Sequence, residues 1–382
     1  MVDRIFSCGV DRIVFLPSLQ ATKSENMLNM NPANRWADME NRILSMEESK
    51  FNTIAAEIHR WQQRNCQAFR RWCELNPKEK PFPTFLPIQF FKTQSILSLE
   101  NRWISDSLPT IFDTQSPVPH LLFESSGTTL QQTSKHWVYN PSLYEQSFLK
   151  TFESRFGKVS ELCIIGLLPS YLERQNSSLV YMVDCLIKQS ESPNSGFYLY
   201  DYEKLWNLIQ DNERKQLPTI VFGVTFAMLE LADFVSYTNV NPTHSNPTQL
   251  YCIQWIETGG MKGRGKELTR AELHNKLTQV LGVNTIQSEY GMTELLSQAY
   301  TRSIDGRFQC PPWMKVRVCD PMDPQDFLPW GKTGRICIID LANLYSCSFI
   351  ATDDLGKVYE DGSFEVLGRL DFSDLRGCNQ LI

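Results

Sequence analysis

The chain has 382 residues, of which 42% are hydrophobic and 21% charged, a mixture typical of a globular protein with two or three domains. Its net charge of −6 and its lack of a long basic run argue against nucleic acid as a partner. No stretch approaches about 18 uninterrupted apolar residues, which argues against a membrane span. Charged residues interrupt any signal-peptide core near the N-terminus, so we expect a cytoplasmic protein with eleven reduced cysteines.

The first part of the chain divides into three segments. Residues 1–30 lack a clear hydrophobic period, and we expect an N-terminal arm over residues 1–35. From Trp36 to Leu75, apolar residues recur at steps typical of helices with charges between them, which predicts two amphipathic helices. The proline-rich stretch Pro77–Pro87 blocks a helix and predicts a connector.

Strand-like and helix-like segments then alternate up to residue 305. The expected strands are His120–Glu124, Leu162–Leu168, Gly196–Tyr200, Thr219–Phe222, Leu250–Glu257 and Thr285–Ser288. The expected helices are Leu143–Phe156, Ser178–Lys188, Tyr202–Gln210, Thr225–Tyr237 and Lys266–Leu281. This alternation predicts an α/β core over residues 36–305, with mostly parallel sheets flanked by helices.

After about residue 305 the pattern changes to short strands separated by Gly, Pro and Asp turns. These strands are expected at Val316–Val318, Gly334–Ile339, Ser348–Ile350, Lys357–Tyr359 and Ser363–Leu367. We therefore expect a small β-rich subdomain over residues 306–370, followed by a C-terminal tail at residues 371–382.

A hydroxyl-rich loop follows the expected strand His120–Glu124. It consists of Ser125, Ser126, Gly127, Thr128 and Thr129, with Lys135 shortly after it. Glycine lets successive backbone amides face one point, the hydroxyls add donors, and a lysine adds positive charge, so the loop is a candidate phosphate site. The alternative is an ordinary solvent loop. It is not a Walker A loop, because no Gly-Lys-Ser/Thr closes it.

A second candidate lies where an apolar strand runs into Thr258, Gly259 and Gly260. Such a step suggests a backbone edge that a ligand approaches closely, with a tight turn as the alternative. The third and most specific string is Ser288–Glu294. There Tyr290 can stack on a base beside the small Gly291, Thr293 can donate to a phosphate oxygen, and Glu294 can bind Mg²⁺.

Two charged positions near the C-terminus complete the candidate set. Asp354, which follows Asp353, is a carboxylate that can hold both hydroxyls of a ribose, and Arg369 adds a fixed positive fork. Each has a simpler alternative, an acidic turn for the aspartates and a surface salt bridge for the arginine.

These motifs occur in the order found in the adenylate-forming (acyl-activating) superfamily. Within it the chain resembles the acyl-protein synthetases of bacterial bioluminescence, also called long-chain-fatty-acid–protein ligases. The closest resemblance lies in the segments Gly166–Arg174, Ser177–Met182, Glu289–Tyr300 and Asp371–Cys378. It covers about residues 36–382 and leaves residues 1–35 outside.

The resemblance implies the large N-terminal part of an adenylate-forming enzyme, with ATP and Mg²⁺ as cofactors. A long-chain fatty acid would be converted to an acyl-adenylate, and a cysteine of the enzyme would then take the acyl group as a thioester. The acyl group would pass to a fatty-acyl reductase that makes the aldehyde in luciferin biosynthesis. An acyl transferase is a further candidate subunit of such a multienzyme complex.

The resemblance also assigns roles to the candidate residues. The loop Ser125–Thr129 would hold the leaving phosphates, Thr258–Gly260 and Tyr290 would frame adenine, and Thr293 and Glu294 would serve the α-phosphate and the metal. Asp354 would bind the ribose, and Arg369 the ribose or a phosphate. Cys378 is the expected acyl acceptor, because an exposed thiol flanked by a cation in a short tail is of the reactive kind. Its alternative is one ordinary cysteine among eleven.

The chain departs from the superfamily in two respects. Only eleven residues follow Asp371, where most members carry about a hundred more that form a mobile lid and deliver a catalytic lysine. We therefore expect no lid domain and another cation, with Lys135 and Lys262 as candidates. Asp353 stands where the superfamily has glycine.

Three alternative functions stay open. The chain could be a coenzyme A ligase of the phenylacetate type, or an enzyme that loads a different acid onto a carrier protein. The third alternative is an inactive scaffold of a reductase complex, against which the intact Thr293, Glu294 and Asp354 argue.

Overall fold

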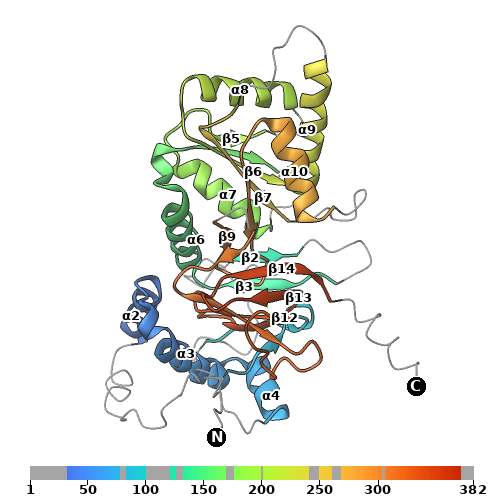
Figure 1. Cartoon of the computed structure of the whole chain (residues 1–382). Helices are drawn as coiled ribbons and strands as arrows, with labels where there is room; N and C mark the ends of the chain where they lie inside the picture. The colour runs from blue at the N-terminus through green and yellow to red at the C-terminus, as the bar shows by residue number, and fades with distance from the viewer. Residues whose placement is uncertain are drawn as a thin grey trace, which may run out of the picture.

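The computed structural model describes residues 32–77, 83–99, 121–125, 132–168, 176–198, 201–240, 249–259, 268–302 and 306–370, with the backbone alone for 32–35 and 238–240. Most of the predicted N-terminal arm and the whole predicted tail therefore lie outside the described residues. Within them the protein is elongated, with one end built of helices around parallel strands and the other of antiparallel strands on a layer of helices (Figure 1).

The α-helices of the described chain lie between residues 32 and 281. The N-terminal ones are α2 (Pro32–Leu44), α3 (Phe51–Asn65), α4 (Gln67–Leu75) and the single turn α5 (Phe90–Thr93). Those of the α/β part are α6 (Pro141–Phe156), α7 (Ser178–Gln189), α8 (Tyr202–Arg214), α9 (Thr225–Val240) and α10 (Arg270–Leu281). None of these helices is both long and apolar enough to cross a membrane.

The strands form one twelve-stranded sheet and a separate hairpin. The hairpin consists of β2 (Leu121–Glu124) and β3 (Lys135–Val138). The sheet contains β1 (Leu86–Pro87), β4 (Cys163–Leu167), β5 (Gly196–Phe197), β6 (Thr219–Val224), β7 (Ile253–Thr258), β8 (Ile286–Tyr290), β9 (Ala299–Thr301), β10 (Phe308–Gln309), β11 (Met314–Cys319), β12 (Thr333–Asp340), β13 (Phe349–Val358) and β14 (Phe364–Arg369).

The first half of this sheet is parallel, in the order β5-β4-β6-β7-β8. All six residues of β6 are buried, because helices cover both faces of a parallel sheet. Helix α9 begins at Thr225, directly after β6, so Thr225 lies at the carboxyl edge of the sheet. Helix α6 begins just after Asn140, whose side chain accepts a hydrogen bond from the Ser142 amide, with Pro141 in the first turn.

The second half of the sheet is antiparallel, in the order β8-β9-β10-β14-β13-β12-β11, and β1 adds to β13 in parallel. The prediction of parallel strands before residue 305 and short strands after it is confirmed in part: the protein is an α/β protein in which both sets of strands belong to one large mixed sheet. The division at residues 305 and 306 stays a prediction, and Phe308 of β10 pairs with Thr301 of β9 across it.

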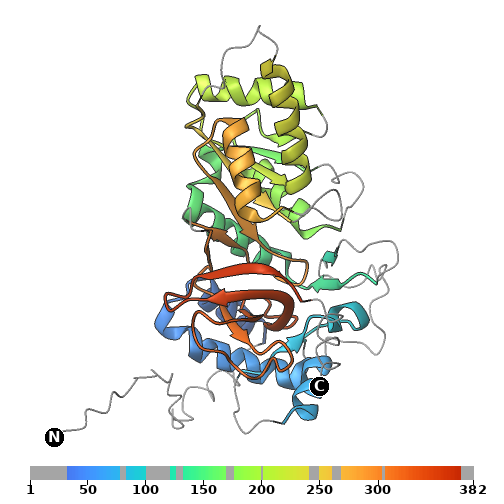
Figure 2. The same ribbon diagram turned by 45° about the vertical axis from the view of Figure 1, so that its right-hand side comes forward.

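Helices α2, α3 and α4 lie beneath the antiparallel strands (Figures 1 and 2). Two helices were predicted there; the structure has three, because the chain breaks at Cys66, whose backbone is extended. Gln62 of α3 anchors the layer, since its buried side-chain amide donates to the carbonyl oxygens of Asn343 and Leu344 at 2.9 and 3.0 Å.

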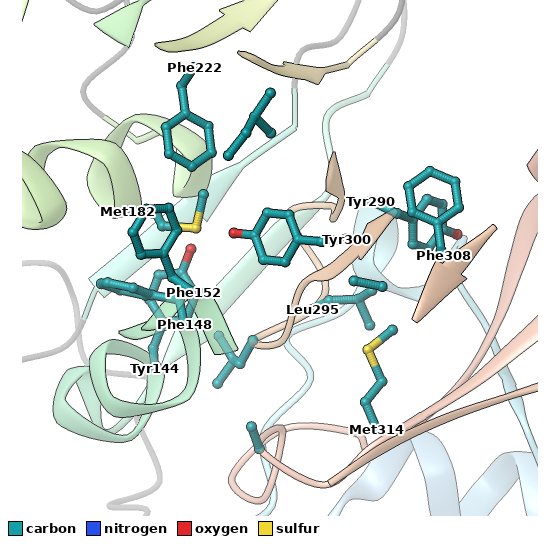
Figure 3. Close-up of a cluster of buried hydrophobic side chains, with 14 of the residues drawn as sticks. Tyr144, Phe148, Phe152, Met182, Phe222, Tyr290, Leu295, Tyr300, Phe308 and Met314 are labelled. Atoms are coloured by element: carbon teal, nitrogen blue, oxygen red, sulfur yellow. The ribbon is translucent and has the colours of Figure 1, made fainter. Parts of the chain in front are cut away.

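One apolar core joins the two halves of the sheet. Figure 3 shows side chains from α6, α7 and β6 meeting those of the segments that follow β7. The cluster includes Tyr144, Phe148, Phe152, Met182, Phe222, Tyr290, Leu295, Tyr300, Phe308 and Met314. Phe152 stacks on Phe222 with ring centroids 5.8 Å apart, and Phe156 meets Tyr300 edge to face at 5.2 Å.

Candidate active site

Three parallel strands bring predicted site residues to one edge of the sheet. Strands β6, β7 and β8 run in the same direction and end at Val224, Thr258 and Tyr290. The carboxyl edge of such a sheet is where ligands bind in open α/β proteins. The Thr258–Gly259 step and the Tyr290–Glu294 string are therefore neighbours in space, although more than 30 residues separate Thr258 from Tyr290.

Thr258 is fixed by Glu289, a residue that sequence reasoning did not single out. The Thr258 hydroxyl donates to Glu289 Oε2 on the adjacent strand. The Glu289 side chain is 9% exposed, and this burial raises its pKa to about 7, against the opposing effect of the Thr258 hydrogen bond. Gly291 leaves room for this carboxylate, because a side chain at that position would meet Glu289 Oε1 and displace it.

The opposite face of the same strands carries a second polar set. The Thr225 hydroxyl donates to Glu257 Oε1 at 2.5 Å and lies 3.1 Å from the carbonyl oxygen of Gly259, which has a φ of 67°. The Ser288 hydroxyl donates to Glu257 Oε2 at 3.2 Å. Burial raises the pKa of Glu257. These bonds hold the three strand ends in register, which fixes the left-handed turn at Gly259.

Tyr290 joins the parallel half of the sheet to the antiparallel half. Its hydroxyl donates to Asp354 Oδ2 at 2.8 Å, and its ring packs against Phe308 and Phe364 at 5.8 and 5.4 Å. Asp354 is itself paired with Arg369 across β13 and β14, with Arg369 Nε 3.5 Å from Asp354 Oδ1. Tyr290, Asp354 and Arg369, which were predicted separately, thus form one contiguous set.

Burial raises the pKa of Asp354, against the hydrogen bond from Tyr290 and the charge of Arg369. The Arg369 side chain is 87% exposed, so its pairing with Asp354 is readily replaced. The described chain ends just beyond, at Leu370, whose amide donates to the carbonyl oxygen of Asp353 at 2.7 Å.

The hydroxyl-rich loop follows β2 and precedes β3 of the hairpin. The Ser125 amide donates to the Ser134 carbonyl oxygen at 3.0 Å, and the Ser134 amide donates to Ser125 Oγ at 2.8 Å. Both ends of the loop are therefore held together at one point, beside the Thr293–Glu294 segment described next.

His136 fastens this hairpin to Thr293. Its Nδ1 is 2.8 Å from the Thr293 carbonyl oxygen and its Nε2 is 3.0 Å from Ser346 Oγ. Burial lowers its pKa to about 4, so the ring is neutral near pH 7. Because a carbonyl only accepts, Nδ1 carries the proton and donates to Thr293, while Nε2 accepts from Ser346.

Glu294 lies in the same place. Its side chain is 5% exposed, and burial raises its pKa, while a hydrogen bond from the Ser134 side chain and the charges of Arg369 and Lys92 lower it. The backbone carbonyl oxygen of Glu294 accepts from Asn343 Nδ2 at 2.8 Å. The carboxylate is thus held against the hairpin, next to the end of the loop.

Lys135 is oriented differently from its neighbours. Ser134 and His136 are buried on the side of the hairpin that faces Thr293 and Glu294, and side chains alternate along a strand. The exposed Lys135 therefore points to the other side, where its Nζ is 3.8 Å from Glu124 Oε1.

The remaining candidates lie outside the described residues. They are Ser126, Gly127, Thr128, Thr129, Gly260, Lys262 and Cys378. Their assignments stay predictions.

The family model "Acyl-protein synthetase, LuxE" matches residues 177–382, more than half of the chain. The chain belongs to this family. The match includes Thr258, Tyr290–Glu294, Asp354 and Arg369 of the site, together with the tail that carries Cys378.

Among individual acyl-protein synthetase relatives, the "long-chain-fatty-acid–luciferin-component ligase" of Vibrio harveyi is 25% identical over 135 residues. That alignment covers 32% of this chain and 35% of the relative, so the chain spans about a third of the length of the curated relative it matches. Solved structures give weaker likenesses. ATP-bound MatB from Rhodopseudomonas palustris has 19% identity and a TM-score of 0.47 over 65% of this chain and 47% of that one. A long-chain-fatty-acid–CoA ligase from Archaeoglobus fulgidus has 14% identity and a TM-score of 0.48, over 68% of this chain and 53% of that one.

The donor set of the site is of the kind that can hold a magnesium ion together with the phosphates of a ligand. Among the described residues, no group of three or more His, Cys, Asp or Glu side chains is placed to hold a metal. Mg²⁺ differs from zinc in this respect, because one or two carboxylates and substrate phosphates usually hold it. Glu294, buried beside the end of the hydroxyl-rich loop, provides such a carboxylate.

An open cavity lies elsewhere in the described part of the chain. It has a volume of about 390 Å³ and is lined by Gly196, Phe197, Tyr198, Asp201 and Lys204, at β5 and the start of α8. It contains none of the motif residues, so the site rests on the contacts of the motif residues and not on this cavity.

Sequence reasoning missed several residues that build the site, above all Glu289, Ser134 and His136. Glu289 directly precedes Tyr290 and so lies within the string Ser288–Glu294, but the sequence does not show that its carboxylate is buried. His136 follows Lys135 in a polar stretch, and the sequence around it gives no sign of a special role. Its role is a tertiary contact, which spacing along the chain does not reveal.

Proposed function

We propose that this acyl-protein synthetase activates a long-chain fatty acid with ATP and Mg²⁺. It then carries the acyl group on Cys378 as a thioester for delivery to a fatty-acyl reductase. The observation that carries the proposal is the meeting of three distant segments. The hairpin at Ser134 and His136 lies against Thr293 and Glu294, while Tyr290 of the same segment binds Asp354.

In the first step a carboxylate oxygen of the fatty acid attacks the α-phosphorus of ATP. The new P–O bond forms as the bond to pyrophosphate breaks, and the electron pair leaves on pyrophosphate. Mg²⁺, held by Glu294 and the phosphates, would offset the negative charge of the phosphates. Thr293 would donate to the α-phosphate, and the amides and hydroxyls of Ser125–Thr129 would hold the departing phosphates.

The nucleoside would lie across the carboxyl edge of the sheet. Thr258, Gly259 and Gly260 would frame adenine together with Tyr290 and Gly291. Asp354 already accepts from Tyr290 at Oδ2, which leaves Oδ1 for a ribose hydroxyl once the exposed Arg369 head turns to a ribose or phosphate oxygen.

In the second step the thiolate of Cys378 attacks the acyl carbonyl carbon. A C–S bond forms, the C–O bond to AMP breaks, and the electron pair leaves on the phosphate of AMP. This is covalent catalysis, in which a good nucleophile divides a difficult transfer into two easier ones. A thiol beside Arg376 has the positive neighbour that favours the thiolate.

The test is mass spectrometry of the intact protein after incubation with ATP, Mg²⁺ and fatty acids of graded length. We expect the mass to rise by one acyl group that hydroxylamine removes, with Cys378 as the modified residue after digestion. The variant Cys378→Ser should keep ATP–pyrophosphate exchange and lose the hydroxylamine-labile acyl group. An acyl group retained by that variant would place the acceptor elsewhere, and absence of exchange with every acid would exclude the adenylation step.

A further inference from the structure

A short segment ahead of the hydroxyl-rich loop reaches the site from outside the family match. Strand β1 pairs with β13 through Leu86 and Pro87, opposite Ile350 and Ala351, just before the Asp353–Asp354 pair. Gln89 follows, and its Nε2 donates to both carboxylate oxygens of Asp353 at 2.6 and 2.8 Å. The start of α5 is therefore tied to the residue next to Asp354.

The other side of α5 is tied to the hairpin. The fully buried Phe91 ring meets the His136 ring edge to face, with centroids 5.5 Å apart. His136 in turn binds the Thr293 carbonyl oxygen. Figure 2 shows this light-blue turn beside the hairpin β2–β3 and the red strands β13 and β14. Two independent contacts thus position α5 between the segments of Asp354 and Thr293.

Lys92 lies on this clamped turn, directly after Phe91. Its side chain is half-buried, and its positive charge acts on the Glu294 carboxyl group, whose pKa it lowers against the effect of burial. Within the described parts of the chain, the Lys92 ammonium has no salt bridge or hydrogen bond. Among the described residues, this ammonium therefore has no bonded partner that an anion would have to displace.

The other two cations near the motifs are placed differently. Lys135 pairs with Glu124 on the far side of the hairpin, and the exposed head of Arg369 pairs with Asp354, the residue proposed to bind the ribose. The phosphates of ATP bring several negative charges beside Glu294 and Asp354, and the five-coordinate phosphorus of the adenylation step must be stabilised by positive charge. Lys92 is a described cation that acts on Glu294 and can add to this stabilisation.

We propose that Lys92 is a catalytic residue whose ammonium binds the α-phosphate of the nucleotide next to Glu294. The catalytic role of Lys92 rests on the proposed adenylation. The phosphate contact itself is a statement about binding and can be tested without turnover.

Two measurements test it on the full-length protein. Calorimetric titration should show that Lys92→Met binds AMP about tenfold more weakly than the wild type, the loss expected for one charged contact, while adenosine binds equally. In ATP–pyrophosphate exchange, Lys92→Met should lose about 100-fold in kcat/KM for ATP, as for removal of one transition-state donor. Lys92→Arg, which keeps the charge, should recover most of both losses.

Lys188→Met is the matched control, because Lys188 pairs with Asp184 on the surface of α7 and its loss should leave AMP binding and exchange unchanged. Equal AMP affinity of Lys92→Met and wild type would overturn the Lys92 assignment, whatever the activity. If the wild type performs no ATP–pyrophosphate exchange but Lys92→Met still binds AMP more weakly than the wild type, the adenylation is refuted and the Lys92 contact is supported. Far-ultraviolet circular dichroism shows whether each variant is folded. Recovery of AMP binding in Lys92→Arg also shows that the lost charge, and not misfolding, causes the loss in Lys92→Met.

Discussion

Glu289 is a buried carboxylate one residue before Tyr290. Its neighbours are a threonine hydroxyl, the tyrosines of the apolar cluster and the Glu257 carboxyl group, and no described cation forms a salt bridge with it. Burial raises its pKa from about 4.5 to about 7. The folded protein therefore keeps the proton that the unfolded chain gives up above about pH 4.5. Stability is lost as the pH rises from about 4.5 through 7, because the carboxylate must ionise in a site that disfavours the charge.

We predict that Glu289→Gln raises the free energy of unfolding by about 2 kcal/mol at pH 8 and by much less at pH 5. The amide keeps an oxygen that accepts from Thr258 but never ionises. Urea unfolding at the two pH values measures the effect, with the exposed Glu161→Gln as control. A gain that is the same at both pH values would show that the ionisation of Glu289 is not its cause.

At the residue scale, sequence reasoning found the side chains with unusual chemistry and missed those that hold them. Tyr290, Thr293, Glu294 and Asp354 belong to a recognisable ordered set. His136 is neutral and buried, and nothing local in the sequence distinguishes such a histidine from one that fills core volume. Its importance comes from Thr293, which is more than 150 residues away.

The loop after β8 depends on a single carboxylate at the end of β12. Asp340 is fully buried, and its Oδ2 accepts from the amides of Leu296 and Ser297 at 2.8 and 3.0 Å. Its Oδ1 accepts from the Ser297 hydroxyl at 2.6 Å and the Ala342 amide at 3.2 Å. The loop that begins with Glu294 is thus fixed from the antiparallel half of the sheet.

We predict that Asp340→Asn destabilises the protein by about 2–4 kcal/mol, because an amide group must face backbone donors where an oxygen stood. It should also lower pyrophosphate exchange by at least about tenfold, through displacement of Glu294. Asp323→Asn, at an exposed turn where the carboxylate accepts from the Gln325 amide, is the control. Urea unfolding and exchange kinetics check both effects, and exchange at the wild-type level in the folded variant would contradict the link to Glu294.

Elements were predictable where their pattern is local. Each strand–helix unit of the parallel half carries its own apolar period, so β4, β6, β7 and their helices lie close to the predicted bounds. Strand β13 differs, because two short strands, Ser348–Ile350 and Lys357–Tyr359, were predicted where the structure has one strand, Phe349–Val358. The chain stays extended there, and Gly356 allows close approach of the Glu365 carbonyl and the Ile336 side chain.

Over the whole molecule, the sheet and the core are continuous from β5 to β11. Strand β10 bonds to both β9 and β14, and its Phe308 stacks on Phe364 with centroids 5.2 Å apart. The antiparallel half was not predicted as part of the same sheet, because the link runs through β9 and β10, which have three and two residues and are too short to show an alternating pattern.

We predict that the two halves unfold together. Hydrogen exchange followed by mass spectrometry in increasing urea should give peptides of β6–β7 and of β12–β13 the same opening free energy near the transition. Separate transitions for the two sets of peptides would support independent units that meet near residue 305.

Strand β14 ends beside the site, where the Leu370 amide that follows it donates a hydrogen bond to the Asp353 carbonyl oxygen. Cys378 follows eight residues later, so its backbone can lie at most about 29 Å from Leu370. A thiol on so short a tether has an effective concentration at the site in the millimolar range, far above the concentration of free thiol at ordinary protein concentrations. Under the proposed transfer, self-acylation is first order in protein, and dilution leaves its half-time unchanged.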